Sequence, residues 1–161
     1  MSRLTHLDEG GRARMVDVSA KVSTTRTAIA EGSLRCSHDT LALVRVGKTP
    51  KGAVVSTAEL AGTMAAKRCA DLVPLCHTLS LTKAEVTVDL DDDLPGFRVS
   101  AMTRTVGQTG VEMEALTAVT VACLTLYDML KAVDRTMSIE AVRLTSKTGG
   151  ASGDFQYGAS I

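Results

Sequence analysis

Aromatic residues are nearly missing from this 161-residue sequence, which has no Trp, two Tyr and two Phe. Proteins that bind single-stranded nucleic acid stack bases on aromatic side chains, so the composition argues against that class. An excess of one charge is missing too, because 18 Lys and Arg residues balance 18 Asp and Glu residues. No overall field therefore attracts nucleic acid or an anionic membrane, and an anionic ligand must be held by local groups.

The sequence also lacks a signal-peptide-like stretch, and its apolar runs are interrupted too often to predict a membrane-spanning helix. It has four cysteines but no Cys-x-x-Cys pair, in a chain long enough to form its own core. We therefore expect a cytoplasmic protein whose cysteines are reduced and mostly serve packing.

Hydrophobic residues make up 45% of the sequence, which together with its length is typical of one globular domain covering residues 1–161. Residues 1–22 show no sustained period and are predicted to form a mobile arm that carries several basic residues. Residues 148–161 are predicted to be a glycine-rich tail.

The apolar pattern predicts a strand at 24–30, followed by a short helix that Ser37 caps and that ends near residue 46. Ser56 and Glu59 match a capping box, so a second helix should begin near residue 57. The remaining predicted elements are an antiparallel hairpin of 84–90 and 97–101 with a bulge near Lys83, a helix over 111–134 and a strand over 137–147. This order is that of a ferredoxin-like α+β sandwich, an antiparallel sheet with helices on one face.

The helix predicted over 111–134 is apolar on nearly every side and should be buried all round. A domain of this size cannot wrap it completely, so we expect part of it to face another subunit. Asp128 and Lys131 nevertheless lie three residues apart on one face of this helix. They are either a structural ion pair or a pair of charges that lines a cleft, where their surroundings could tune the lysine for proton transfer.

Several other polar residues have both a structural and a functional interpretation. Glu112 and Glu114 either compensate the dipole of the helix that they begin or bind a ligand. His77 is either a core histidine or a ligand-binding group. Lys51 and Lys147 lie near glycines and are either solvated or bind phosphate.

The cysteines and histidines do not predict a metal site. Cys36, His38, Cys69, Cys76 and His77 could be imagined as zinc ligands, but their spacing matches no zinc pattern. The neighbours Cys76 and His77 would also point apart in an extended backbone. We therefore predict no metal site, and a zinc-dependent hydrolase remains an alternative that metal analysis would reveal.

Six stretches of the sequence match one known family. The most specific is 107–117 (GQTGVEMEALT), and the others are 15–19 (MVDVS), 65–68 (AAKR), 74–77 (PLCH), 124–129 (LTLYDM) and 147–153 (KTGGASG). Over almost its whole length, the chain resembles the cyclic pyranopterin monophosphate synthase family of molybdenum-cofactor biosynthesis. Two positions depart from the family pattern, because Thr78 stands where proline often follows the histidine and Ala151 where the glycine-rich end often has lysine.

The resemblance implies a homohexamer, a trimer of dimers, that converts 3',8-cyclo-7,8-dihydro-GTP into cyclic pyranopterin monophosphate and releases pyrophosphate. It implies catalytic roles for Lys51, Asp128 and Lys131. It implies substrate-binding roles for Leu75, Cys76, His77, Glu112, Met113, Glu114 and Lys147. No resident cofactor is implied, although Mg²⁺ could accompany the triphosphate. A non-catalytic oligomeric module that binds a pterin or nucleotide is the alternative.

The spacing on the long helix bears on where the site is assembled. Glu114 and Asp128 share a helix face but are separated by about 21 Å, at ~1.5 Å per residue. Two such residues cannot both contact one ring system within a single chain. We therefore predict that each site combines residues of two subunits, with this helix antiparallel to its symmetry mate.

Overall fold

The computed structural model of the chain describes residues 10–159. Its elements are β1 (Thr24–Arg35), α1 (His38–Arg45), α2 (Val54–Ala66), α3 (Cys69–Leu72), β2 (Leu81–Asp91), β3 (Gly96–Gly107), α4 (Glu112–Leu130), β4 (Ser138–Thr148) and β5 (Phe155–Gln156). The strands form one antiparallel sheet in the order β2-β3-β1-β4-β5. The predicted ferredoxin-like α+β sandwich is therefore confirmed, with β5 added at one edge.

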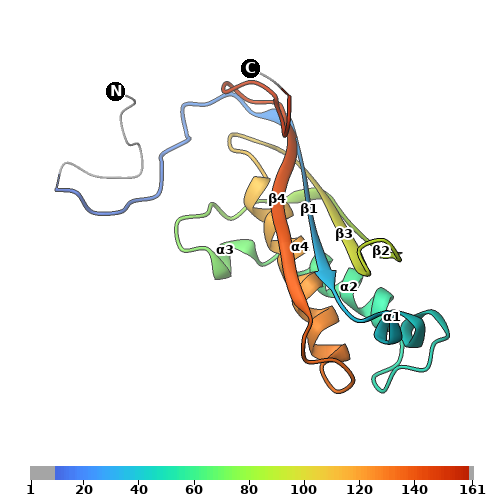
Figure 1. Ribbon diagram of the computed structural model, residues 1–161. Helices are drawn as coiled ribbons and strands as arrows, with labels where there is room; N and C mark the ends of the chain where they lie inside the picture. The colour runs from blue at the N-terminus through green and yellow to red at the C-terminus, as the bar shows by residue number, and fades with distance from the viewer. Residues whose placement is uncertain (1–9, 160–161) are drawn as a thin grey trace.

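The helices α2 and α4 lie along one face of the sheet, and the core fills the space between these two layers (Figure 1). Alternate residues of the central strands point into this core, so Ala30 and Leu34 of β1 and Phe97 of β3 are fully buried. The closest approach is at Gly32 in β1, where an added Cβ would lie 2.8 Å from Val119 Cγ1 in α4. Glycine at this position lets the helix pack directly on the strand.

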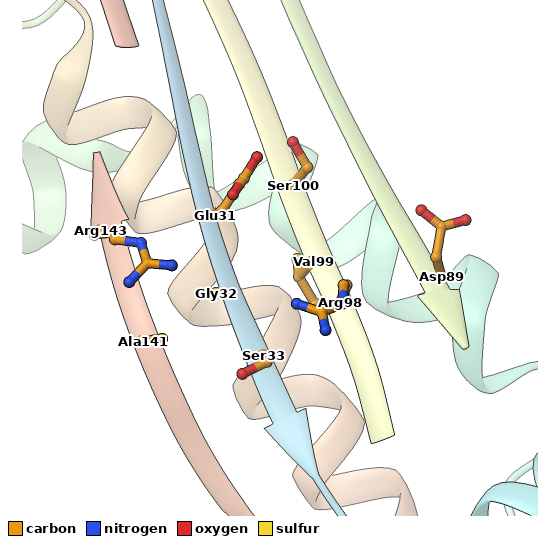
Figure 2. Close-up of a pocket in the computed structure, with 9 residues that line it drawn as sticks. All are labelled: Glu31, Gly32, Ser33, Asp89, Arg98, Val99, Ser100, Ala141 and Arg143. Carbon is orange, nitrogen blue, oxygen red and sulfur yellow. The ribbon is translucent and has the colours of Figure 1, made fainter. Parts of the chain in front are cut away.

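The opposite face of the sheet bears charged side chains instead of helices in the part of the chain that the structure describes. Figure 2 shows Glu31, Arg98 and Arg143 standing out from β1, β3 and β4, with α4 behind the sheet. They line a cavity of about 240 Å³ that contains none of the predicted site residues. Near this cavity the pairing of β1 with β4 is irregular, and Ala141 has a φ of 54°.

Some predicted helix and strand boundaries agree with the structure, and others do not. Ser37 caps α1 as expected, because its side chain accepts a hydrogen bond from Thr40 N. The predicted bulge near Lys83 is confirmed by a register shift between β2 and β3. The capping box at Ser56 is wrong, because α2 already begins at Val54 and Glu59 accepts a hydrogen bond from Val88 N of β2 instead.

Helix α4 differs from the helix predicted in two respects. By length and composition it could cross a membrane, contrary to the expectation from the sequence, but half of it is buried against the sheet in the position of a core helix. It is also not buried all round in one chain, because a stripe on its outer face stays exposed. Met113, Thr120, Leu124 and Asp128 belong to this stripe.

The predicted arm falls partly outside the described residues, which begin at residue 10. Residues 10–22 form no helix and no extended strand. Their connections to the body of the protein include a hydrogen bond from Gln108 Nε2 to Ser19 O and one between His77 Nε2 and Val16 O. The mobility of the arm stays a prediction. After the glycine-rich end, the chain returns to the sheet as β5, a strand that the sequence did not predict.

Candidate active site

The predicted site residues form two groups at opposite ends of α4. We call Lys51, Asp128 and Lys131 the lysine cluster, which lies at the C-terminal end of the helix. The second group, the pocket cluster, lies at its N-terminal end and consists of Leu75, Cys76, His77, Glu112, Met113, Glu114 and Lys147. The structure thus brings each predicted set together, but it does not join the two sets within one chain.

The lysine cluster is centred on the carboxylate of Asp128. Lys131 Nζ lies 2.6 Å from Asp128 Oδ1, and Lys51 Nζ lies 2.7 Å from Asp128 Oδ2. Lys51 belongs to the loop between α1 and α2, and its ammonium group also donates to the Asp128 carbonyl at 3.1 Å. The hydrogen bonds from Lys131 and then Lys51 lower the pKa of Asp128 to about 2. Asp128 is therefore an ionised acceptor that holds two cations side by side.

The expected burial of these charges is wrong for a single chain. The side chains of Lys51, Asp128 and Lys131 are 44%, 53% and 54% exposed, respectively. Asp128 lies on the outer stripe of α4, Lys131 follows it at the end of the helix, and Lys51 approaches from the loop between α1 and α2. A lysine that transfers protons near neutral pH needs a lowered pKa, which burial supplies. One chain does not supply that burial here.

The pocket cluster borders a cavity of about 380 Å³ beside the first turn of α4. The segment before β2 contributes Leu75, Cys76 and His77, and α4 contributes Glu112 and Met113. The arm closes one side with Val16, Val18 and Lys21. His77 Nε2 lies 2.7 Å from the carbonyl oxygen of Val16, and because a carbonyl can only accept, the imidazole donates this hydrogen bond.

Two carboxylates in the first turn of α4 have different surroundings. Glu112 folds back over Gly110 and lies 3.9 Å from Lys147 Nζ, so it is part of an ion pair. Glu114 is only 3% exposed, and burial raises the pKa of its carboxyl. Its Oε1 accepts a hydrogen bond from the Cys76 thiol at 3.6 Å, whereas Oε2 is buried without a hydrogen-bond partner among the described residues.

The glycine-rich end, beside which Lys147 was either solvated or a phosphate ligand, forms a closed loop. Gly149 and Gly150 both have φ near +90°, at 87° and 88°. The amide of Gly149 donates to Asp154 Oδ1 at 3.0 Å, and Lys147 donates to the hydroxyl of Ser152. Part of the polar capacity of this loop is therefore used internally. A phosphate would have to compete for Lys147 with Glu112 and Ser152.

Arg26 is a residue near the site that the sequence analysis missed. Its Nε donates to Gly107 O at 2.9 Å and its Nη2 donates to Gln108 O at 3.2 Å. An added Cβ on Gly150 would lie 2.1 Å from Arg26 Nη1, so the guanidinium group packs directly against the glycine-rich loop. Arg26 thus ties this loop to the segment that leads into α4. The alternation of β1 could have identified Arg26, because it places this charged residue on the same, core-facing side of the strand as Ala28 and Ala30.

Chemically, the two clusters supply complementary functions. The lysine cluster offers two ammonium groups on one carboxylate, which suits proton donation and removal. The pocket cluster offers an apolar wall, an imidazole, carboxylates and a lysine, which suits recognition of a polar ring with an attached anion. Their separation, about 21 Å along α4 from Glu114 to Asp128, keeps these functions apart in one chain.

Comparison with known proteins agrees with the resemblance seen in the sequence. The model of the MoaC family matches residues 15–150. Cyclic pyranopterin monophosphate synthases of Brucella ovis, Brucella melitensis and Brucella abortus are each 57% identical to the chain over 153 residues, which is 95% of this chain and 93% of theirs. The family match covers both clusters, because Lys51 and Lys147, their first and last residues in the sequence, both lie within it. The chain therefore belongs to the MoaC family.

Proposed function

We propose that the protein is a cyclic pyranopterin monophosphate synthase of molybdenum-cofactor biosynthesis. It converts 3',8-cyclo-7,8-dihydro-GTP to cyclic pyranopterin monophosphate and releases pyrophosphate. The observation that carries this proposal is the lysine cluster, where Lys51 and Lys131 contact opposite oxygens of the Asp128 carboxylate. An exposed helix has no structural need for two cations on one carboxylate, whereas a rearrangement with several proton transfers requires both an acid and a base.

We assign the roles of the residues from the family resemblance and from their positions in the two clusters. Lys51 and Lys131 act as general acid and base, and Asp128 orients them. His77 and Glu114 bind the guanine-derived ring, with Leu75, Cys76 and Met113 around it. Lys147 and Glu112 lie where the triphosphate would enter, and Lys147 neutralises part of its charge.

Two subunits are needed to bring the clusters together. The outer stripe of α4 runs from Met113 past Leu124 to Asp128, and Leu124 is 56% exposed. The adjoining helix α2 exposes Leu60 and Met64, at 61% and 48%. Such an apolar face is typical of a surface that another subunit covers. A two-fold axis near residue 121, halfway between Glu114 and Asp128, would place each of them beside the other's symmetry mate.

Three further properties belong to the same proposal. The protein is a homohexamer built as a trimer of dimers, in which the α4 pair is the dimer contact. It is cytoplasmic, which agrees with four cysteines that form no disulfide among the described residues. Mg²⁺ enters as a counter-ion of the triphosphate. The protein's own cations for the triphosphate are Lys147 and Lys21, of which Lys21 lines the cavity.

The decisive experiment is incubation of the purified protein with 3',8-cyclo-7,8-dihydro-GTP, with pyranopterin measured after oxidation to a fluorescent pterin and pyrophosphate measured separately. Both products should form in equal amounts. The alternative, a non-catalytic module for a pterin or nucleotide, predicts binding of the substrate by calorimetry with neither product. Binding without turnover in the parent protein would reject the enzymatic proposal.

A further inference from the structure

Three potential metal ligands meet beside the pocket cluster, although the sequence spacing did not suggest it. Cys69 begins α3, Cys76 lies seven residues later, and Glu114 belongs to the first turn of α4. The two Sγ atoms and a Glu114 carboxylate oxygen all lie within 4.8 Å of one another. Cys69 and Glu114 are buried, and Cys76 is half-buried at the cavity.

The two distances that involve Cys76 Sγ are those of a tetrahedral zinc site. With Zn–S near 2.3 Å and Zn–O near 2.0 Å, tetrahedral angles place two sulfurs about 3.8 Å apart and a sulfur and an oxygen about 3.5 Å apart. The Sγ atoms of Cys69 and Cys76 are 3.8 Å apart. Cys76 Sγ and Glu114 Oε1 are 3.6 Å apart. Both distances that involve Cys76 therefore match an ion of this size, and the third pair, Cys69 and Glu114, lies within 4.8 Å.

Two more contacts point to a bound cation. Glu114 Oε2 is buried and has no hydrogen-bond partner among the described residues, so this carboxylate has an unused acceptor in a position where one is costly. Thr117 Oγ1 lies 3.4 Å from Cys69 Sγ, where its hydroxyl could donate to a thiolate. A donor of this kind outside the coordination shell stabilises a metal-bound sulfur.

We propose that Cys69, Cys76 and Glu114 form a Zn²⁺-binding site whose fourth coordination position opens to the cavity, and that Zn²⁺ bound there inhibits the enzyme. Three protein ligands and one open position differ from the closed four-ligand set of structural zinc sites, so the ion is exchangeable. The inhibitory part rests on the proposed function, because Cys76 and Glu114 are assigned to the substrate there. Zn²⁺ and substrate then compete for the same two side chains.

Binding must release protons. Burial and then the neighbouring Glu114 raise the pKa of Cys76 to about 12, and burial also raises the pKa of Cys69. Both thiols are therefore protonated in the metal-free protein. When Zn²⁺ binds, two Zn–S bonds replace two S–H bonds, and both protons pass to solvent. Two thiolates and one carboxylate then surround the dication.

Co²⁺ is a spectroscopic probe for this site in the intact, reduced protein. One equivalent per chain should produce thiolate-to-cobalt charge-transfer absorption and the visible bands of tetrahedral Co²⁺, and added Zn²⁺ should remove both. Cys69→Ala should weaken Co²⁺ binding by at least about tenfold, as expected for loss of one ligand. Cys123→Ala is the matched control, because Cys123 is equally buried but lies elsewhere in the core. Cys76→Ala repeats the test if the first variant does not fold.

Absence of thiolate absorption with one equivalent of Co²⁺, or its persistence in Cys69→Ala, would overturn the site. Inhibition is measured separately, as the Zn²⁺ concentration that halves pyranopterin formation. Removal of the ligand in Cys69→Ala should raise that concentration at least about tenfold relative to Cys123→Ala, and a chelator should restore activity. Co²⁺ binding without inhibition by Zn²⁺ would reject the inhibitory part alone. Because the spectra need no substrate, they decide the site even if the proposed function fails.

Discussion

At the scale of single residues, Asp128 shows how one carboxylate can organise a candidate catalytic group. It fixes the positions of two ammonium groups that come from a loop and from the end of a helix. Because hydrogen bonds from these lysines lower its pKa to about 2, Asp128 stays charged over the whole pH range in which an enzyme is normally assayed. A change of protonation at neutral pH must therefore occur elsewhere in the site.

Asp128→Asn and Lys131→Ala should each lower kcat by about 10²- to 10⁴-fold, the usual contribution of a positioned acid or base. Asn keeps the shape of Asp128 but removes the charge that holds both lysines. Because all three side chains are exposed in one chain, the fold should persist, as checked by thermal melting. We expect the oligomer to persist as well, because the apolar residues of the outer stripe are unchanged, and size-exclusion chromatography checks it. Asp92→Asn removes a similar exposed ion pair, with Arg45, and should leave kcat unchanged. A near-parent rate in either cluster variant would make these residues structural.

Asp134 has a structural function, because it connects the turn after α4 to the N-terminus of α1. It accepts hydrogen bonds from the amide and the hydroxyl of Thr136, at 2.9 and 2.8 Å. It also accepts one from Ser37 N at 2.9 Å, next to the N-terminus of α1. Burial alone would raise the pKa of Asp134, but the hydrogen bonds from Ser37 and Thr136 outweigh it and lower the pKa from 3.8 to about 2.

Asp134→Asn should lower the free energy of unfolding by roughly 1–3 kcal/mol at neutral pH, because the amide nitrogen cannot accept these hydrogen bonds. The folded-state pKa lies below the unfolded-state value, so the parent keeps this stabilisation above about pH 4 and loses it as the pH falls towards 2. Urea unfolding at several pH values, at one fixed protein concentration, gives the difference between parent and variant. That difference should shrink below pH 4, and a difference that grows there would contradict the assignment.

At the scale of elements, the sequence predicts most of the sheet but only part of the helix boundaries. Alternation in β2 and β3 identifies the hairpin, since each residue faces either the core or solvent. The capping box at Ser56 fails because a hydrogen bond to Val88 N of the neighbouring strand uses the Glu59 carboxylate. A local motif cannot reveal a tertiary partner of this kind. The short strand β5 is missed for a similar reason, because its order comes from pairing with β4.

In the candidate site, too, the sequence predicts local pairs but not contacts between distant segments. The sequence supports Asp128 and Lys131 as a pair because they are three residues apart on a helix. The role of Lys51 came only from the family resemblance, and its contact with Asp128, 77 residues away, was not predicted. The meeting of Cys69, Cys76 and Glu114 could not be derived, because Glu114 is 38 residues after Cys76 and reaches it only through the packing of α4. Contacts between distant segments depend on packing that no periodic pattern describes.

The link between Arg26 and the glycine-rich loop can be tested at the same scale. Gly150→Ala places a methyl group 2.1 Å from Arg26 Nη1, so the guanidinium group must move away from Gly107 and Gln108. We expect about a tenfold rise in KM, equivalent to about 1.4 kcal/mol, with a much smaller change in kcat. Gly153→Ala is the matched control, because Gly153 also has a positive φ, 74°, but has nothing within 4 Å of the added Cβ. Equal effects of the two substitutions would show that only backbone strain matters.

At the scale of the whole molecule, the arrangement of α4 explains why one chain looks incomplete. The side of the helix that faces the sheet builds the core, with Ala118, Ala122 and Leu126 fully buried. Its outer side connects the two clusters through exposed apolar residues. In a single chain, Lys51 and Lys131 are exposed and distant from the pocket cluster. The antiparallel partner helix that we propose would change both, because it would cover Lys131 and bring the partner's pocket cluster to it.

Mixed oligomers test this arrangement directly. Subunits with Lys131→Ala have an intact pocket cluster, and subunits with His77→Ala have an intact lysine cluster, so each homogeneous oligomer should be inactive. After dissociation and random reassembly of equal amounts, about half of the α4 dimers contain one subunit of each kind. One of the two sites in such a dimer is intact. The mixture should therefore recover about a quarter of the parent activity. Mixing Lys131→Ala with Lys51→Ala is the control, because both changes damage the lysine cluster and no dimer then carries an intact site. Native mass spectrometry verifies that subunits have exchanged. No recovery in verified mixtures of the first pair would mean that each site is built within one chain. A change in α4 itself would then have to close the distance of about 21 Å between the clusters, calculated from about 1.5 Å per residue.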